Sequence, residues 1–135
     1  MVGILLLTHV PLGQAFIEAA AHVFRARPER IEAIDVRADQ DTTEVKSMAK
    51  AAIARLDDGS GVLVITDVMG GTPSNCTLPL SDPGHVEIIA GVSLPMLLRA
   101  ITYRNDTLDV VVEMALAGGQ SGAMRVDNRV RLSPN

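Results

Sequence analysis

The stretch Val2-Gly3-Ile4-Leu5-Leu6-Leu7-Thr8-His9 decides how this chain folds. It is a short run of apolar, mostly branched side chains, which is typical of a strand buried on both faces of a parallel sheet. A titratable side chain stands where the run ends. In open α/β sheets, ligands and reacting groups gather at the carboxyl ends of the strands. The run therefore predicts a buried first strand that brings His9 to the mouth of the fold.

A second apolar run, Gly61-Val62-Leu63-Val64-Ile65-Thr66, is followed directly by Asp67. We expect this strand to bring Asp67 to the same edge of the sheet as His9. A neutral imidazole that a carboxylate orients is a nucleophile or a base. Two simpler interpretations stay open: His9 as a capping or hydrogen-bonding side chain, and Asp67 as the residue that begins a turn.

Apolar runs alternate with segments of helical period along the rest of the chain. Further strands are predicted at 31–36, 62–66 and 86–90, and helices at 12–26, 42–56, 74–80, 94–103 and 108–116. In the helix 42–56, Val45, Met48 and Ala49 begin a core-facing stripe, and Asp41 with Glu44 resembles a capping box. The order predicts a doubly wound, three-layer α/β/α fold with a four-stranded parallel sheet.

Residues 124–132 alternate apolar and polar side chains, which is typical of an antiparallel edge strand. Such a strand needs a neighbour, because its free backbone groups invite association. We expect it to pair within its own sheet or with a second copy of the chain, and a homodimer is the expected state. Residues 1–135 are expected to form a single domain.

The composition excludes several classes of function. The chain has 135 residues, of which 47% are hydrophobic and 2% aromatic, and its net charge is −4. This charge gives no electrostatic footprint for nucleic acid, and so few aromatic side chains offer no platform for stacked bases. Cys76 is the one cysteine, so a reducing cytoplasm is the expected compartment. We find neither a secretory signal nor the ~20 apolar residues of a membrane helix, so a soluble protein is expected.

The segment 68–75, which reads VMGGTPSN, has the composition of an anion-binding turn. Gly70 and Gly71 permit close approach of the backbone, and Thr72 suits the cap of a helix whose first residue is a proline. A helix that begins there aims free N–H groups at an anion. The segment predicts a phosphate-sized site without a Walker lysine, and its simpler interpretation is a tight strand-to-helix turn.

Signatures of other sites are missing from the sequence. It contains no esterase elbow, no P-loop and no dinucleotide-binding glycine motif. The three histidines lack metal-ligand spacing, and one cysteine cannot build a zinc site, so we expect no metal ion and no cofactor. His22 and His85 are interpreted as surface or capping residues, and nothing around Cys76 predicts a reactive thiolate.

Three segments carry a family resemblance: the strand end Thr8-His9, the loop Asp67-x-x-Gly70-Gly71-Thr72-Pro73-x-Asn75, and Ile89-Ala90-Gly91-Val92-Ser93-Leu94-Pro95-Met96-Leu97. In this order and spacing they resemble the IIA domain of the mannose (mannose/fructose/sorbose) family of the bacterial phosphoenolpyruvate-dependent sugar phosphotransferase system. The resemblance covers nearly all of residues 1–125. It implies an α/β phosphocarrier that forms homodimers by exchanging the last strand.

The resemblance also assigns roles to residues. His9 is expected to accept a phosphoryl group from the phosphorylated carrier protein HPr and to pass it to a IIB partner, while Asp67 holds the imidazole. A free imidazole has a pKa of about 6.5, so most of it is neutral in the cytoplasm and able to accept the group. The residues expected to hold the phosphoryl oxygens are Gly70, Gly71, Thr72 and Ser74.

The chain also departs from the better-known members of that family. They carry an aromatic residue in the two loops, whereas this chain has 10–13 VPLG after His9 and Met69 in the second loop, so a different partner surface is expected. We expect no fused IIB domain, and any membrane association is expected to be peripheral to a permease. Two alternatives stay open: a regulatory IIA protein that moves no sugar, and a non-catalytic module that binds a small anion.

Overall fold

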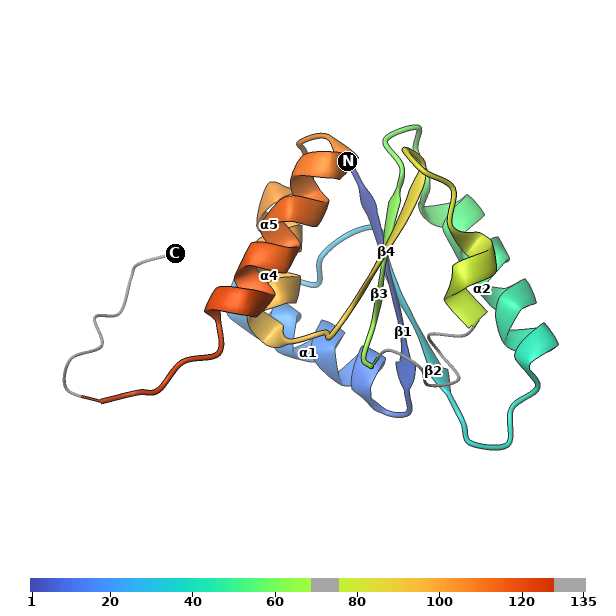
Figure 1. Cartoon of the computed structure of the whole chain (residues 1–135), viewed down its shortest axis with the longest axis horizontal. Helices are drawn as coiled ribbons and strands as arrows, with labels where there is room; N and C mark the ends of the chain where they lie inside the picture. Colours follow the sequence, from blue (N-terminus) through green and yellow to red (C-terminus); the bar gives the residue numbers. More distant parts are fainter. Residues whose placement is uncertain (69–75, 128–135) are drawn as a thin grey trace.

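The structure is a computed structural model, and it describes residues 1–68 and 76–127. The elements in chain order are β1 (Gly3–His9), α1 (Leu12–Phe24), β2 (Ile31–Val36), α2 (Thr42–Leu56), β3 (Val62–Thr66), the 3-10 turn η1 (Leu78–Leu80), β4 (Val86–Ala90), α4 (Leu94–Tyr103) and α5 (Leu108–Ser121). Figure 1 shows the sheet between two layers, with α1, α4 and α5 on one face and α2 on the other. The predicted three-layer α/β fold is therefore confirmed.

The four strands are parallel and lie in the order β2-β1-β3-β4. On one side of β1, His9 pairs with Val36 of β2. On the other side, Leu7 pairs with Thr66 of β3. All four strands thus end at the same edge of the sheet, which we call the carboxyl edge, and the opposite edge is the amino edge.

Alternation along the strands divides the core into two parts. Ile4 and Leu6 of β1 pack under α1, α4 and α5, and Leu5 and Leu7 pack under α2. All four side chains are fully buried. Burial of one such side chain is worth roughly 1.5–3 kcal/mol, so both faces of β1 contribute to stability. This explains why the opening run is almost continuously apolar.

The helix α2 departs from its sequence prediction in two details. Asp41 caps it, but the carboxylate accepts the N–H of Thr43, and Glu44 instead accepts a hydrogen bond from the side chain of Gln40. The predicted capping box is therefore a single cap. Met48 is 41% exposed, so its assignment to the core stripe is wrong. The helix is turned so that Val45 and the small alanines of the stripe face the sheet, and Met48 lies at the margin.

Two helices end at other residues than predicted. The helix α1 stops at Phe24, because Arg25 adopts a left-handed conformation with φ of 61°. The helix α5 runs past residue 116 to Ser121, through two glycines. Gly118 is buried there against α4, at a point where a side chain would meet the backbone oxygen of Pro95. Close packing of two helices therefore overrides the low helix propensity of glycine.

The predicted last strand and the predicted helix 74–80 are described only in part. Residues 124–127 form no strand, and 128–132 lie outside the described residues. Figure 1 shows residues 122–127 leaving the body of the molecule after α5, away from the strands of the sheet. Of 74–80, residues 76 and 77 are helical and Leu78–Leu80 form a 3-10 turn, whereas 74 and 75 lie outside the described residues. Among the helices described, none combines the length and the apolar character needed to cross a membrane.

Candidate functional site at the carboxyl edge

His9 and Asp67 meet at the carboxyl edge. The ring nitrogen Nδ1 of His9 lies 2.7 Å from Oδ2 of Asp67. The same oxygen accepts the backbone N–H of His9 at 2.9 Å, and Oδ1 accepts the N–H of Val68 at 2.9 Å. Three hydrogen bonds thus fix the carboxylate, and the carboxylate fixes both the backbone and the ring of His9.

The two side chains differ in exposure. The side chain of His9 is 47% exposed, whereas that of Asp67 is 7% exposed. Because an ionised carboxylate only accepts hydrogen bonds, the proton of the neutral ring lies on Nδ1. The other nitrogen, Nε2, then carries the lone pair. The arrangement offers a visiting molecule one oriented nucleophilic nitrogen on a ring that is bonded to the buried carboxylate of Asp67.

The electrostatics of Asp67 suit this role. Burial by itself would raise the pKa of the carboxyl group, but hydrogen bonds from His9 and Val68, together with the charge of a protonated His9 ring, hold the pKa below its usual value. Asp67 is therefore a carboxylate at neutral pH. Such a group stabilises any positive charge that develops on the ring to which it is bonded.

Backbone contacts between β3 and β4 hold Asp67 in place. The N–H of Gly91 donates to the carbonyl oxygen of Asp67, and the N–H of Val92 donates to that of Thr66, each at 3.1 Å. Gly91 has φ of 89°, a conformation that favours glycine. The segment that follows β4 is therefore hydrogen-bonded to the end of β3. The other predicted site residues, Gly70, Gly71, Thr72 and Ser74, lie outside the described residues.

Asp35 is a further acid at this edge that the sequence analysis did not single out. It lies near the end of β2, where Oδ1 accepts the N–H of Gly13 at 2.8 Å and the hydroxyl of Thr8 at 3.1 Å. Oδ2 accepts the N–H of Gln14 at 3.3 Å. The signal was present in the sequence, because an acidic residue near the end of an apolar run is the same feature that drew attention to Asp67.

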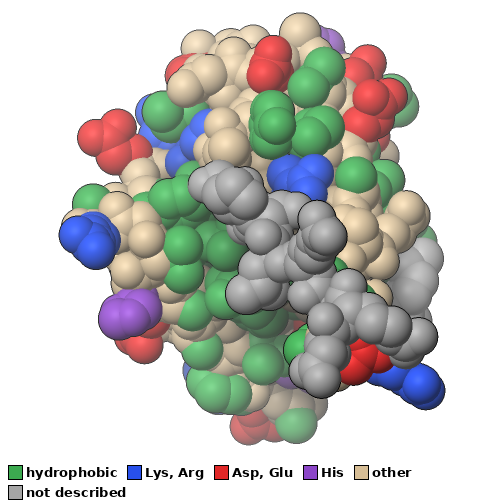
Figure 2. All heavy atoms as spheres, turned by 90° about the vertical axis from the view of Figure 1, so that its left-hand side faces the viewer, with side chains coloured by type: hydrophobic (Ala, Val, Ile, Leu, Met, Phe, Trp, Pro, Cys, Tyr) green, Lys and Arg blue, Asp and Glu red, His purple; other side chains and the backbone are tan. Residues whose placement is uncertain are grey.

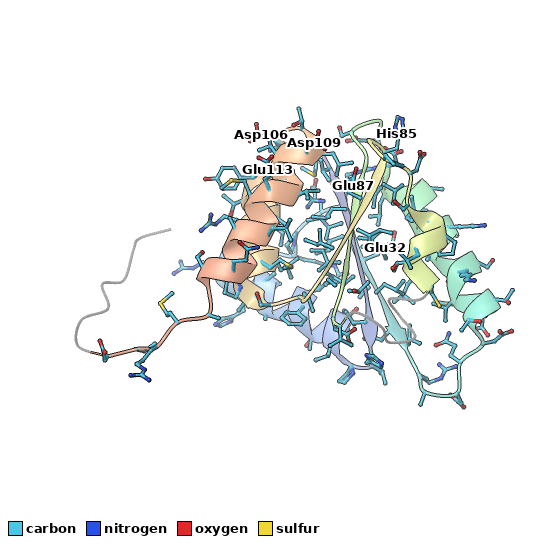
Figure 3. The ribbon with its side chains drawn as sticks, in the orientation of Figure 1. Glu32, His85, Glu87, Asp106, Asp109 and Glu113 are labelled. Carbon is cyan, nitrogen blue, oxygen red and sulfur yellow. The ribbon has the colours of Figure 1, made fainter. Side chains whose placement is uncertain are left out.

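The other residues weighed from the sequence lie elsewhere. His22 and His85 are exposed, and Figure 3 shows His85 beside the start of β4, at the amino edge. Cys76 is buried, and burial raises the pKa of its thiol, which favours the thiol over the thiolate. Within residues 1–68 and 76–127, no cluster of three His, Cys, Asp or Glu side chains is placed to hold a metal ion.

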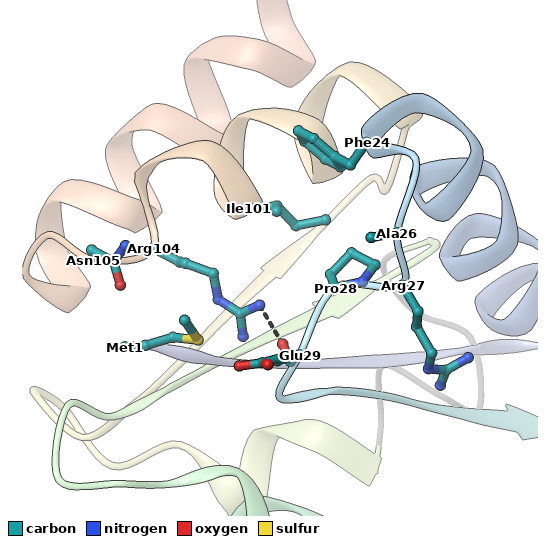
Figure 4. Close-up of a pocket in the computed structure, with 9 residues that line it drawn as sticks. All are labelled: Met1, Phe24, Ala26, Arg27, Pro28, Glu29, Ile101, Arg104 and Asn105. Atoms are coloured by element: carbon teal, nitrogen blue, oxygen red, sulfur yellow. Dashed lines mark hydrogen bonds between the residues drawn. The ribbon is translucent and has the colours of Figure 1, made fainter.

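A pocket of about 310 Å³ opens at the amino edge, at the far end of β1 from His9. Phe24, Pro28 and Ile101 line it together with Arg104 (Figure 4). The guanidinium of Arg104 donates to the carbonyl oxygens of Val2, Glu29 and Arg30. Its donors are therefore used to hold the fold together, and the pocket contains no oriented reactive pair comparable to that at the carboxyl edge.

Comparison with known proteins identifies the family of this chain. The family model EIIA-man, described as the PTS system fructose IIA component, matches residues 3–116. The chain belongs to this family. The matched range contains all four strands, and both His9 and Asp67, so the IIA resemblance found in the sequence is confirmed.

Curated relatives of this IIA chain are longer than it is. The mannose-specific EIIAB component of the phosphotransferase system of Escherichia coli K12 is 31% identical over 105 residues, and so is that of Shigella flexneri. The match covers 76% of this chain and 32% of each relative. The IIA chain thus corresponds to about a third of the length of these proteins.

Solved structures share the fold of the IIA chain. An EIIA component from Streptococcus agalactiae superimposes with a TM-score of 0.82 at 21% identity, covering 93% of this chain and 97% of that one. A mannose/sorbose-specific IIA subunit from Enterococcus faecalis gives a TM-score of 0.81 at 16% identity, covering 97% and 98%. At such identities the likeness concerns the architecture alone.

Proposed function

We propose that this chain is a cytoplasmic phosphocarrier of the sugar phosphotransferase system, and that Nε2 of His9 carries the phosphoryl group. The observation that supports this most is the 2.7 Å contact between His9 Nδ1 and Asp67 Oδ2, beneath a half-exposed ring. It provides a nucleophilic nitrogen in one tautomer, at a surface that a protein donor can reach. Family membership supplies the context, because the matching family consists of IIA components.

The proposed reaction is the transfer of a phosphoryl group between two imidazoles. The lone pair of His9 Nε2 attacks the phosphorus of phosphorylated HPr, the new N–P bond forms, and the donor's N–P bond breaks with its electron pair returning to the donor nitrogen. The Nδ1 proton of His9 stays on the ring, held by Asp67, which balances the positive charge. The same steps, with a IIB partner as the nucleophile, pass the group onward.

The surroundings of His9 favour reversible transfer. Neither 10–15 nor 68–75 contains Lys or Arg. In the proposal, backbone N–H groups and hydroxyls of Gly70, Gly71, Thr72 and Ser74 hold the phosphoryl oxygens without a fixed positive charge. A carrier must release its group, and a lysine or arginine bound to the phosphoryl oxygens would oppose that release. A neutral cradle suits the function better.

Exposed apolar residues that neighbour His9 and Asp67 in the chain form a rim that suits a protein donor. Val10 is 53% exposed, Leu12 is 40% exposed and Val68 is 52% exposed. Val10 directly follows His9, Val68 directly follows Asp67, and Leu12 is the first residue of α1, so all three are close in the chain to the reactive pair. A reacting group at the centre of an apolar patch is typical of a protein interface, whose core is depleted of charge. We propose that HPr and the IIB partner dock on this rim in turn.

We also propose a homodimer in which the segment 124–132 of one copy pairs with β4 of the other. Val86 exchanges two backbone hydrogen bonds with Asp82, at 2.8 and 3.1 Å, so the backbone groups of Ile88 and Ala90 face outward in the same way. The described residues give these backbone groups no partner, and a groove of about 160 Å³ lies along β4, the last strand of the sheet. A strand of alternating character fits an open edge of this kind.

Exposed apolar side chains on the face of α1 and α5 support the same proposal. Val23 and Phe24 are 50% and 40% exposed, and Leu116 is 36% exposed. Figure 2 shows hydrophobic side chains gathered on this side of the molecule. Light scattering after gel filtration tests the dimer: the full chain is expected to elute as a dimer and a chain ending at Gly122 as a monomer. A monomeric full chain would contradict it.

Labelled phosphoenolpyruvate, Enzyme I and HPr test the carrier function. We expect one acid-labile phosphoryl group per wild-type chain, none on His9→Ala, and normal labelling of the control variants His22→Ala and His85→Ala. ³¹P spectra should assign the group to Nε2. Adding the IIB partner and its permease with sugar then separates transport from a purely regulatory role. Label that persists on His9→Ala would refute the proposal, and a wild type that binds phosphate without labelling would favour the anion-binding module.

A further inference from the structure

Asp35 joins the two ends of the loop that carries His9. Thr8, whose hydroxyl donates to Oδ1 at 3.1 Å, directly precedes the histidine. Gly13 and Gln14, whose N–H groups donate at 2.8 and 3.3 Å, open the helix that follows the loop. One carboxylate on the neighbouring strand therefore bonds to the chain before and after the reactive residue.

The position of Asp35 follows from the period of its strand. Ile31 and Ala33 of β2 belong to the core under α1, and Asp35 is the next residue on that face. It lies beside Thr8 in the register and reaches the first turn of α1. Pro11, the residue before that helix, makes no side-chain cap. The carboxylate of another strand thus provides the missing cap, which satisfies two N–H groups of the first turn.

Gly13 leaves the space that this carboxylate occupies. A Cβ atom at position 13 would lie 2.7 Å from Oδ1 of Asp35 and 3.0 Å from both the hydroxyl of Thr8 and Cβ of Ala33. Glycine costs helix stability relative to alanine, so its presence here has a packing reason. The reason is the close contact between the helix amide and the carboxylate. Two residues on different elements, Gly13 and Asp35, thus form one joint.

We propose that Asp35 is a positioning residue for phosphoryl transfer through His9, an inference that rests on the proposed function. Only four residues, 9–12, separate the two anchored points, so a shift of either one moves the backbone of His9. Asp67 orients the ring, and Asp35 holds the loop from which the ring projects. A displacement of about 1 Å in a reacting group costs up to roughly 10²-fold in rate. We expect a loss of about 10-fold without the Asp35 carboxylate, because Asp67 still holds the ring.

The test uses two variants of the joint and one matched control. Asp35→Ala removes the carboxylate. Gly13→Ala keeps the carboxylate but pushes it away from the helix, because the added Cβ would lie 2.7 Å from Oδ1 of Asp35. The control is Asp41→Ala, which removes the capping carboxylate of α2, where Thr43 donates its N–H at 3.1 Å. All three are expected to lower the melting midpoint by several degrees. Labelling from phosphorylated HPr should lose about 10-fold in maximal rate in the two joint variants, with little change in half-saturation, and should be unchanged in the control.

A spectroscopic measurement separates positioning from stability and from activity. Long-range ¹H–¹⁵N spectra report which nitrogen of His9 carries the proton. We expect the Nδ1–H form to dominate in the wild type and in the control, and a minor population of the Nε2–H form in Asp35→Ala, because a shifted backbone weakens the hydrogen bond between His9 and Asp67. The conservative variant Asp35→Asn keeps an oxygen acceptor for Gly13 and should restore part of the rate.

Each outcome decides the proposal. Equal labelling rates and an unchanged His9 tautomer in Asp35→Ala, Gly13→Ala and the control would overturn it and leave Asp35 as a helix cap. If Asp35→Ala does not fold, Gly13→Ala and Asp35→Asn carry the same comparison. If wild-type protein takes up no label, the proposed function fails, and the tautomer of His9 in the variants still shows whether Asp35 positions the ring.

Discussion

One oxygen atom of Asp67 serves His9 twice: Oδ2 lies 2.9 Å from the backbone nitrogen of His9 and 2.7 Å from its ring nitrogen Nδ1. The orientation of the ring is thereby tied to the backbone from which it projects. Since one acceptor fixes both, the imidazole cannot turn over without losing a charge-assisted hydrogen bond. The free nitrogen therefore faces outward in a defined direction, which is what a group-transfer site requires.

Replacement of Asp67 tests the importance of this double contact. Asp67→Ala removes both bonds and the negative charge, and we expect uptake of the phosphoryl group to slow by about 10²-fold. Asp67→Asn keeps an oxygen acceptor without the charge, so its rate of uptake should lie between those of the wild type and Asp67→Ala. Rapid-quench labelling from phosphorylated HPr measures the rates, and circular dichroism confirms folding. Wild-type rates in both variants would reduce Asp67 to a turn residue.

The stability of the protein should depend on Asp67 in acid. Burial opposes ionisation, but the hydrogen bonds from His9 and Val68 outweigh it, so the folded-state pKa lies below the unfolded value of about 3.9. The contribution to stability is then present above pH ~4 and is lost as the pH falls through the folded-state pKa.

Urea unfolding of wild type and Asp67→Asn at several pH values measures that contribution. We expect the wild type to have the larger free energy of unfolding at pH 7, and the difference to shrink as the pH falls below about 4. A difference that stays constant from pH 7 to pH 3 would contradict the assigned direction of the pKa shift.

Two adjacent glycines of α5 should respond oppositely to alanine. A Cβ at Gly118 would lie 2.8 Å from the backbone oxygen of Pro95 and 2.9 Å from Cβ of Arg99, so Gly118→Ala should destabilise the protein by about 1–3 kcal/mol. At Gly119 the near atom is the terminal methyl of Met96, which can move aside. Gly119→Ala should therefore be neutral, or stabilising by up to about 1 kcal/mol. Thermal unfolding of both variants measures the two changes in stability. Equal changes would contradict the packing of α5 on α4.

Arg104 should matter for stability and not for phosphoryl transfer. Burial lowers its pKa, and its guanidinium donates to carbonyl oxygens of Val2, Glu29 and Arg30 at the amino edge. Arg104→Met leaves these carbonyl oxygens without their hydrogen-bond donor, and we expect a loss of about 3 kcal/mol in the free energy of unfolding.

The matched control for Arg104 is Arg55→Met, which removes an exposed arginine bound to Glu32 at 2.8 Å and should have a much smaller effect. Urea unfolding compares the two variants, and labelling at 10 °C compares their transfer rates, which should equal that of wild type. A slow transfer rate in folded Arg104→Met would link the amino edge to the reactive site, against expectation.

The sequence was most informative where the pattern of apolar residues is strong. The strands at 31–36, 62–66 and 86–90 and the helices at 42–56 and 94–103 have the predicted bounds, because burial imposes their period on the side chains. Predictions failed at Met48 and at the ends of α1 and α5. Those features depend on how a helix is turned and on what its last residues touch, and no local pattern records either.

The sequence by itself determined the α/β class, the parallel sheet, and the delivery of His9 to the carboxyl edge, because side-chain period and strand polarity are local properties. Only the tertiary structure decided the strand order and register that place Oδ2 of Asp67 between two nitrogens of one residue. It also brought Asp35 under the first turn of α1. The hydrogen bond between Gly13 and Asp35 joins residues 22 positions apart, and that between His9 and Asp67 joins residues 58 positions apart. Such bonds depend on angles and distances that exist only once the layers have packed.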